Sequence, residues 1–298
     1  DGPSILADQD EVRLNCPDWL WQSWSGAYGA EVTQKLVASM LLEPALDLTF
    51  KSGAGDWVQA LGGEVLPTGS LRRTAGGAIQ ELPGFEVGEW WVQDAAAALP
   101  VRLLGEMTGR EVLDLCAAPG GKTAQLAVSG ARVTAVDNAP KRVALLRSNM
   151  QRLDLQAETF VADALTWRPD KLFDFILLDA PCSATGTIRR HPDIWHLRAP
   201  EDVAQAAALQ DQLLQAAIEM LAPGGTLIYI TCSLQPEECE QRIDAFLASG
   251  APVTRRPIDA TELFGLDELI TPLGDMRTLP HHLGGLDGFY ACRLVRNG

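Results

Sequence analysis

Residues 111–123 read EVLDLCAAPGGKT and decide the fold class of this chain. The aliphatic run Glu111–Cys116 predicts a buried strand, and the pair Gly120–Gly121 shortly after it predicts a tight turn into a helix. A strand that enters a helix through such a turn is typical of a parallel sheet wound with right-handed crossovers.

The same alternation of strand and helix continues toward the C-terminus. We expect further strands at 132–137, 158–163, 173–179 and 225–231, and helices at 140–153 and 201–221. The last apolar segment, 288–295, follows no long helix, which indicates an antiparallel strand. The sequence therefore predicts an α/β fold with a mainly parallel sheet and an antiparallel last strand. Ligands of such sheets bind at the carboxyl ends of the strands.

The composition changes near residue 95, because six of the eight Trp residues precede it. We expect residues 1–94 to form a helical start followed by a small α+β subdomain, and residues 95–298 to form the main α/β domain. Within the subdomain the pattern predicts strands at 46–51, 64–66 and 90–92 and a short helix from Asp56.

The charge of the chain disfavours a protein held to nucleic acid by a generally basic surface. The 298 residues carry 24 Lys and Arg against 39 Asp and Glu, a formal net charge of -15 at pH 7. The acidic excess lies outside residues 101–200, where 13 basic residues face 11 acidic ones. The part of the chain with the most regular pattern is therefore slightly basic.

Several classes are excluded by composition. No apolar stretch approaches the roughly 18 to 20 residues of a membrane span. The opening DGPSILADQD has neither a basic start nor an apolar run, so we expect no signal peptide, and it lacks Met, so we expect a piece of a longer gene product. Six cysteines without a C-x-x-C pair predict neither a disulfide scaffold nor a metal site, and indicate reduced thiols in the cytoplasm.

Acidic residues end three of the expected strands, namely Asp137, Asp163 and Asp179. The glycine turn before them matches neither the dinucleotide nor the phosphate-loop spacing, so we expect a carboxylate rather than a phosphate at the start of its helix. A nucleoside with an amino-acid tail fits this set, and we predict S-adenosylmethionine as the cofactor. Taken singly, each Asp could equally cap the following helix.

Cysteines follow the last two parallel strands, Cys182 in Pro-Cys-Ser and Cys232 in Thr-Cys-Ser. Neighbouring strand ends would bring both thiols to one ligand, whereas Cys16, Cys239 and Cys292 are predicted to pack in the interior. A thiolate suits methylation of a pyrimidine at carbon 5, because its addition to carbon 6 makes carbon 5 nucleophilic. A second thiol could then assist release of the product.

Long motifs in a fixed order carry a resemblance to a known family. They are DLCAAPGGKTAQLA, AVDNAPKRVALLRSN, LLDAPCSATGTIRRHPDIWHLR, ITCSLQPEECEQRIDAFL and DGFYACRL, with PGFEVGEWWVQDAAA upstream. Over residues 75–298 the chain resembles the NOL1/NOP2/Sun family of RNA cytosine carbon-5 methyltransferases, and within it the RsmB/Sun type that acts on bacterial 16S ribosomal RNA. The resemblance implies a Rossmann-like S-adenosylmethionine-dependent methyltransferase fold preceded by an RNA-recognition-like subdomain.

The resemblance also implies roles for individual residues. Cys232 corresponds to the nucleophile and Cys182 to the thiol that assists product release. The cofactor contacts implied are Cys116, Ala117, Ala118, Pro119, Gly120, Gly121, Lys122, Asp137, Asp163 and Asp179. Lys122 and Asp179 also correspond to residues near the target base.

The RNA side of the site is predicted more coarsely. Arg189, Arg190 and His191 fall in the stretch that the resemblance places near RNA. A target cytosine must be unstacked to reach strand-edge thiols, and Trp195 is a candidate to stack on it, or else a packing residue. We expect a single chain to be active.

Four other functions compete with this hypothesis. The substrate could be another RNA such as tRNA, or the chain could be a catalytically silent RNA-binding assembly factor, which would need neither Cys182 nor Cys232. Enzymes that methylate exocyclic amines favour Asn or Asp-Pro-Pro-Tyr after the fourth strand, where this chain has Asp-Ala-Pro-Cys. A nicotinamide-dependent oxidoreductase is disfavoured because G-x-G-x-x-G is absent.

The charge distribution predicts weak RNA binding by these 298 residues. The resemblance implies that full-length enzymes carry an N-terminal helical RNA-binding domain similar to NusB, which we expect to supply most of the affinity. The affinity of this chain should be low, and its salt dependence should be set by a few phosphate contacts. Titration of labelled RNA at several salt concentrations measures both quantities, and tight, salt-resistant binding would contradict the expectation.

Overall fold

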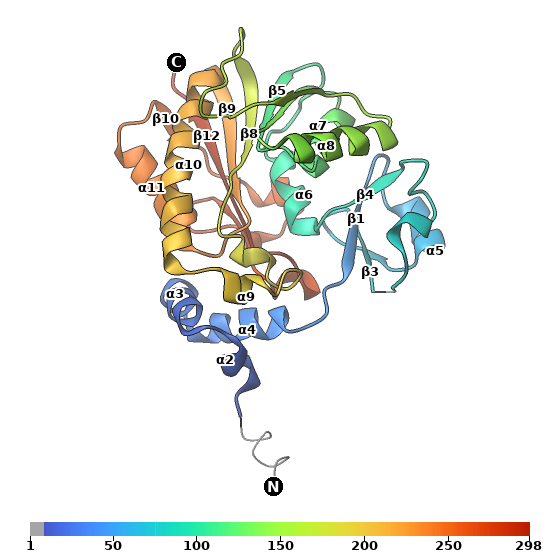
Figure 1. Ribbon diagram of the computed structural model, residues 1–298, viewed down its shortest axis with the longest axis vertical. Coiled ribbons are helices and arrows are strands. Elements are labelled where there is room, and N and C mark those ends of the chain that lie inside the picture. The colour runs from blue at the N-terminus through green and yellow to red at the C-terminus, as the bar shows by residue number, and fades with distance from the viewer. Residues whose placement is uncertain (1–8, 75) are drawn as a thin grey trace.

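The structure, a computed structural model, describes residues 9–74 and 76–298 (Figure 1). Its main body is a mixed sheet built from β5 (Glu111–Leu115), β6 (Arg132–Asp137), β7 (Glu158–Val161), β8 (Phe173–Asp179), β9 (Leu221–Thr231), β10 (Val253–Arg255), β11 (Met276–Thr278) and β12 (Phe289–Arg296). The strand order is β10-β12-β9-β8-β5-β6-β7, and β11 pairs with β12. Strands β5 to β9 pair in parallel, and β12 runs antiparallel to β9, which confirms the predicted fold class.

Helices cover both faces of this sheet. They are α6 (Ala95–Arg102), α7 (Gly121–Val128), α8 (Pro140–Arg152), α10 (Pro200–Met220) and α11 (Glu240–Ala248). The short helix α9 (Ile194–Leu197) packs instead with the N-terminal helices. Because side chains alternate along a strand, Ile176 and Leu178 of β8 pack in the core that includes α10, whereas Leu177 packs in the core that includes α6. The near-continuous apolar runs of β8 and β9 therefore reflect burial on two faces.

A small antiparallel sheet precedes the main one. It consists of β1 (Leu46–Phe50), β2 (Glu64–Val65), β3 (Leu71–Arg73) and β4 (Trp90–Val92), in the order β2-β3-β1-β4, with α5 (Val58–Leu61) beside it. Strand β3 was not predicted, because two of its three residues are Arg. Arg72 is nevertheless buried, since its guanidinium forms two 2.7 Å bonds to the carboxylate of Asp47 on β1.

The N-terminal helices α2 (Glu11–Asn15), α3 (Asp18–Tyr28) and α4 (Ala30–Met40) pack against the main body rather than only on the small sheet (Figure 1). The expected helical start also covered residues 1–8, which lie outside the described residues. Trp24 of α3 donates a 2.8 Å hydrogen bond to Gln235, and Tyr28 donates one of 2.7 Å to the carbonyl of Leu234. These bonds join the start of the chain to the loop that follows β9.

Trp195 of α9 belongs to the same contact. Its side chain is 6% exposed, and its ring centroid lies 5.8 Å from that of Trp24. The prediction that Trp195 stacks on a flipped base is therefore wrong, because helix α3 already covers the indole. The alternative interpretation, in which Trp195 is a packing residue, is confirmed.

Two carboxyl ends of the parallel strands differ from the prediction. β5 ends at Leu115, so Cys116 lies in the turn with a φ of 60°, and β7 ends at Val161, two residues before Asp163. Helix α6 and strands β10 and β11 were not predicted. Across the described part of the chain, no helix combines the length and apolar character needed to cross a membrane.

Trp195→Ala should lower the free energy of unfolding by about 3 kcal/mol, because it removes a buried ring and leaves a cavity against Trp24. Trp195→Phe keeps an aromatic ring and should cost less. Urea denaturation of both variants beside the parent chain measures the difference. A loss below about 1 kcal/mol for Trp195→Ala would mean that the indole is not a core element.

Candidate active site

Two cysteine thiols meet where β8 and β9 end. The strands pair in parallel with Asp179 opposite Ile230, so the loops that follow both strands begin at the same edge of the sheet. Cys182 and Cys232 lie in the loops that follow, both only partly buried, and their Sγ atoms are 3.4 Å apart. The predicted convergence of these two thiols is thus present in the structure.

The Cys182 thiol is held in its protonated form. Its hydrogen bond to Cys232, its burial and the nearby charges of Cys232 and Glu238 raise the pKa of Cys182 well above its ordinary value. Two adjacent sulfurs cannot both ionise easily, because the charges repel in a partly desolvated site. The pair therefore favours a state in which the Cys182 S–H donates to the Cys232 sulfur.

Lys122 supplies a positive charge beside the thiols. Its ammonium donates a 2.8 Å hydrogen bond to Asp179 and lies 5.2 Å from the centre of the Phe289 ring. Burial would lower the pKa of Lys122, but the charges of Asp179 and Cys232 and the hydrogen bond outweigh it, so this pKa is raised. Lys122 consequently stays a cation at neutral pH, next to the reactive sulfurs.

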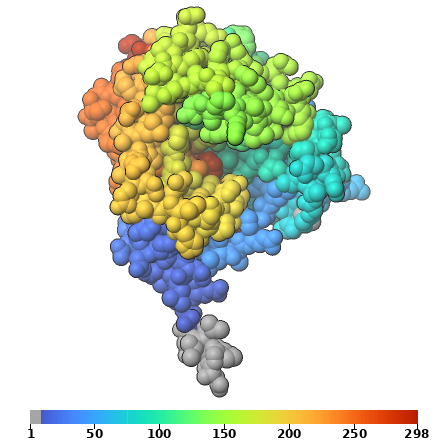
Figure 2. Space-filling view, in the orientation of Figure 1, coloured from blue at the N-terminus to red at the C-terminus, as the bar shows by residue number. Residues whose placement is uncertain are grey.

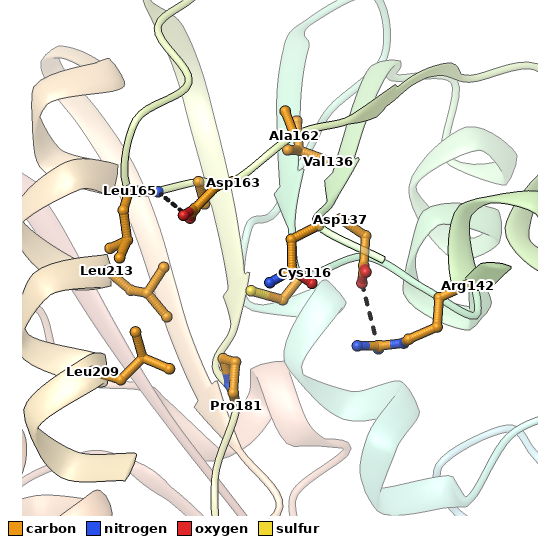
Figure 3. Close-up of a pocket in the computed structure, with 12 residues that line it drawn as sticks. Cys116, Val136, Asp137, Arg142, Ala162, Asp163, Leu165, Pro181, Leu209 and Leu213 are labelled. Carbon is orange, nitrogen blue, oxygen red and sulfur yellow. Dashed lines mark hydrogen bonds and ion pairs between the residues drawn. The ribbon is translucent and has the colours of Figure 1, made fainter. Parts of the chain in front are cut away.

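A pocket opens beside this pair, across the carboxyl ends of β5 and β6 (Figure 3). Its empty volume, open mouth included, is about 420 Å³. The lining residues are Cys116, Val136, Asp137, Asn138, Arg142, Ala162, Asp163, Ala164, Leu165, Pro181, Leu209 and Leu213. Pro181 directly precedes Cys182, so the pocket and the thiols adjoin.

Asp137 is the most constrained acid of the pocket. Its side chain accepts hydrogen bonds from the backbone N–H of Ala118 at 3.2 Å and of Ala139 at 3.1 Å, and the Arg142 guanidinium lies 3.4 Å away. Asp163, on the opposite wall in Figure 3, accepts from the N–H of Leu165 at 3.0 Å. Both carboxylates are therefore fixed by the backbone turns that carry them.

The glycine turn lies outside the lining of this pocket: Gly120 and Gly121 line a separate hollow together with Trp91 and Arg152. Gly120 has a φ of 105°, and a Cβ at this position would lie 3.0 Å from Leu146. Helix α7 begins directly after it, and no side chain caps its first turn. Uncapped N–H groups at a helix start attract anionic groups such as a carboxylate.

The predicted site residues fall into two neighbouring groups. Cys116, Asp137 and Asp163 line the pocket, whereas Lys122 and Asp179 stand with the thiols; Asp179 is not among the described residues that line the pocket. Ala117, Ala118, Pro119 and Gly120 form the turn from β5 to α7, Gly121 begins α7, and these five predicted contacts are not among the residues that line the pocket. Cys16, Cys239 and Cys292 are buried, as predicted.

Arg189 is not available to RNA. Its side chain is 4% exposed and lies between the carboxylates of Asp94 and Asp287, with which it forms ion pairs. Within the stretch that the resemblance places near RNA, Arg189 is therefore a buried structural residue, because a doubly paired guanidinium of this kind cannot reach a phosphate. Arg190 and His191 are exposed, and the segment that carries them borders the hollow at the centre of Figure 2.

Three residues of the site were missed from the sequence: Asp114, Arg142 and Glu238. Arg142 lies in the first turn of α8, and only its closeness to Asp137 in the sequence could have indicated a role. Glu238 belongs to the acidic run PEECE, which is typical of a solvated surface, yet its side chain is fully buried. Asp114 lies within a buried strand, and its carboxyl accepts a 2.6 Å hydrogen bond from Thr123.

The fold and the site together define a Rossmann-like methyltransferase. A solved structure of a methyltransferase homolog protein from Pyrococcus horikoshii has a TM-score of 0.79 and 27% identity, and covers 96% of this chain and 97% of that one. The structure of NSun6 from Pyrococcus horikoshii, at 19% identity, has a TM-score of 0.78 over 95% of this chain and 98% of its own, which supports the fold alone.

The sequence comparisons specify the family. A family model described as 16S rRNA methyltransferase RsmB/F matches residues 101–295. Two proteins named ribosomal RNA small subunit methyltransferase B are similar: that of Erwinia tasmaniensis is 47% identical over 98% of this chain and 68% of its own length, and that of Sodalis glossinidius 38% identical over 99% and 69%. This chain belongs to the RsmB/F family, which confirms the resemblance drawn from its motifs.

The buried Asp114 predicts a pH dependence of stability. Burial is the main cause that raises the pKa of Asp114 from 3.8 to about 7, and its Oδ1 has no hydrogen-bond partner among the described residues. The folded chain thus holds this proton more tightly than the unfolded chain, and the resulting stabilisation is lost as the pH rises from 4 toward 7 and above.

Asp114→Asn, which mimics the protonated acid, should therefore stabilise the chain by about 2 to 4 kcal/mol at pH 8 relative to the parent, and by much less at pH 5. Urea unfolding at the two pH values measures the difference. An equal effect at both pH values would show that Asp114 does not titrate in this range.

Proposed function

We propose that this chain is an S-adenosylmethionine-dependent RNA cytosine carbon-5 methyltransferase that acts on 16S ribosomal RNA through a covalent cysteine-cytosine intermediate. The observation that carries the proposal is the 3.4 Å approach of the Cys182 and Cys232 sulfurs at neighbouring strand ends beside the pocket. The RNA substrate rests on the names of the curated relatives, both small-subunit ribosomal RNA methyltransferases.

The pocket fits S-adenosylmethionine by the chemistry of its residues. Asp137, held at the end of β6, suits ribose hydroxyls. The uncapped start of α7, outside the pocket lining, suits the methionine carboxylate. Leu165, Leu209 and Leu213 offer apolar surface to adenine, with Asp163 beside them for its amino group. When bound, the cofactor supplies an electrophilic sulfonium methyl group.

Cys232 acts as the nucleophile in this proposal. Its thiol loses its proton to solvent and its sulfur forms a bond to carbon 6 of cytosine, so the electron pair of the 5,6 double bond moves toward carbon 5. Carbon 5 would then take the methyl group from the sulfonium sulfur, which would leave as a neutral thioether. The nearby Lys122 ammonium stabilises negative charge in this part of the site. Together with Asp179, to which it is hydrogen-bonded, it is placed to contact the target base.

Cys182 assists the release step. After methyl transfer the proton on carbon 5 must leave to a base, the 5,6 double bond re-forms, and the Cys232 sulfur departs from carbon 6. The first cause of the raised pKa of Cys182 is its hydrogen bond to Cys232, with the charge of that sulfur adding to it. Both causes disappear once Cys232 is a neutral thioether, so Cys182 ionises more easily at the stage that needs a base.

Methylation of an exocyclic amine fits the site less well. Such a reaction needs no covalent bond to a thiol, so the paired sulfurs of Cys182 and Cys232 would have no role in it. The proposed chemistry requires both thiols to be reduced, as in the cytoplasm. We expect one chain to act as a monomer, because both thiols and the pocket belong to the same sheet edge.

Cys232→Ala should abolish methyl transfer to 16S ribosomal RNA while S-adenosylmethionine still binds, because the pocket lies on the other strands. Cys182→Ala should form the adduct but release it slowly, so a protein-RNA species stable to denaturation should accumulate on a gel. Transfer of labelled methyl groups and calorimetric cofactor binding measure the two properties. Cys16→Ala, between helices α2 and α3 and outside the two thiol loops, is the matched control and should behave as the parent chain.

Full activity of Cys232→Ala would refute the covalent mechanism. The substrate is tested separately by mapping 5-methylcytosine in 16S ribosomal RNA and in tRNA incubated with the enzyme. Methylation of tRNA alone would overturn the ribosomal part of the proposal and leave the chemistry intact.

A further inference from the structure

Glu238 is a buried carboxylate with no role in the mechanism described so far. It ends the short 3-10 helix Pro236–Glu238, six residues after Cys232, and its side chain is 0% exposed. Burying a charge is costly unless several donors surround it. The donors around this carboxylate therefore indicate what it does.

The two loops that carry the thiols both donate to Glu238. Its Oε1 accepts a 2.7 Å hydrogen bond from the backbone N–H of Ser183, and its Oε2 accepts from the hydroxyls of Ser183 and Ser233. Ser183 directly follows Cys182, and Ser233 directly follows Cys232. One carboxylate thus holds the residue next to each sulfur.

Further bonds extend this junction to the surrounding structure. Gln210 of α10 donates to Glu238 at 3.3 Å and to the carbonyl of Pro181, the residue before Cys182, at 2.9 Å. The two hydroxyls of Ser183 and Ser233 are themselves 3.1 Å apart. In a low-dielectric interior such a network fixes its members strongly when every donor is paired.

An apolar side chain of similar volume would fill this space at a lower free-energy cost than a buried carboxylate. Burial raises the pKa of Glu238, and the hydrogen bonds from Ser183, Ser233 and Gln210 oppose that shift. Replacement of buried charged groups by apolar ones of similar volume is often neutral or stabilising in proteins. The Glu238 carboxylate therefore serves to position the residues that donate to it rather than to stabilise the fold.

We propose that Glu238 is a positioning residue that sets the distance between the Cys182 and Cys232 sulfurs by binding the residue that follows each of them. Its catalytic meaning rests on the proposed function of the two thiols. Its geometric effect does not, since the thiols stand 3.4 Å apart without substrate.

The tendency of the two thiols to form a disulfide measures their relative position without RNA. In glutathione buffers, oxidised glutathione takes up two electrons from the thiols and yields two reduced glutathiones and one Cys182–Cys232 disulfide. Peptide mapping of the whole chain gives the fraction of that disulfide. Glu238→Ala should lower its equilibrium constant by about tenfold, the effect of one hydrogen bond to a charged acceptor, and Glu238→Gln by less.

Glu237→Gln is the matched control, because Glu237 is the exposed neighbour in the same turn. It should leave the disulfide equilibrium unchanged. Ser183→Ala removes the hydroxyl bond and keeps the backbone N–H bond to Glu238, whereas Ser233→Ala removes the bond from Ser233. Each should lower the constant, Ser183→Ala by less, yet neither should lower it further in a chain that already has Glu238→Ala, because these bonds act through the same carboxylate.

An unchanged equilibrium in folded Glu238→Ala, or additive effects in the double variants, would overturn the proposal. If Glu238→Ala does not fold, the disulfide equilibrium constants of Glu238→Gln and of the two serine variants test the proposal in its place. Methyl transfer by the same variants provides the second readout, and we expect kcat to fall with the equilibrium constant while cofactor affinity stays unchanged. If Cys232→Ala proved active, the proposed function would fail, but the disulfide measurement would still decide the role of Glu238.

Discussion

The parallel register of β8 and β9 is the constraint on which the site depends. Because these strands run side by side in one direction, the loops after Asp179 and Thr231 leave the sheet at one edge. The backbone N–H of Gly186 donates a 3.0 Å hydrogen bond to the carbonyl of Cys232, which ties the first loop to the second. Gly186 is required there, since a Cβ would lie 1.9 Å from the carbonyl oxygen of Gly288. Strand pairing therefore brings the thiols near each other, and loop contacts set their final approach.

A second feature joins the two halves of the site. The cofactor pocket lies over β5 and β6, and the thiols lie over β8 and β9, so the halves meet where the strand order reverses direction. Lys122 lies at the start of α7, after β5, and its side chain extends to Asp179 at the end of β8. This ion pair holds the glycine turn against the thiol loops, and a methyl donor and an acceptor base would lie on its two sides.

Much of this arrangement could be predicted from local sequence, and the remainder could not for identifiable reasons. Periodicity predicted the parallel strands, and strand ends predicted that Cys182 and Cys232 converge. The burial of Trp195 and of Arg189 depends on partners about 170 and 95 residues away in sequence, Trp24 and Asp94, which no local pattern reveals. Glu238 was missed because an acidic run predicts exposure, whereas this carboxylate meets its donors only after both loops have folded.

In the proposed reaction Cys232 bonds to carbon 6 of a cytosine, and one measurement tests this bond most directly. RNA in which 5-fluorocytosine replaces cytosine has no proton to lose at carbon 5, so the adduct cannot be released after methyl transfer. Digestion of the trapped complex and mass spectrometry should find the nucleotide on the peptide that contains Cys232, with the methyl group attached. Attachment to Cys182, or methylation with no protein-bound nucleotide, would contradict the account.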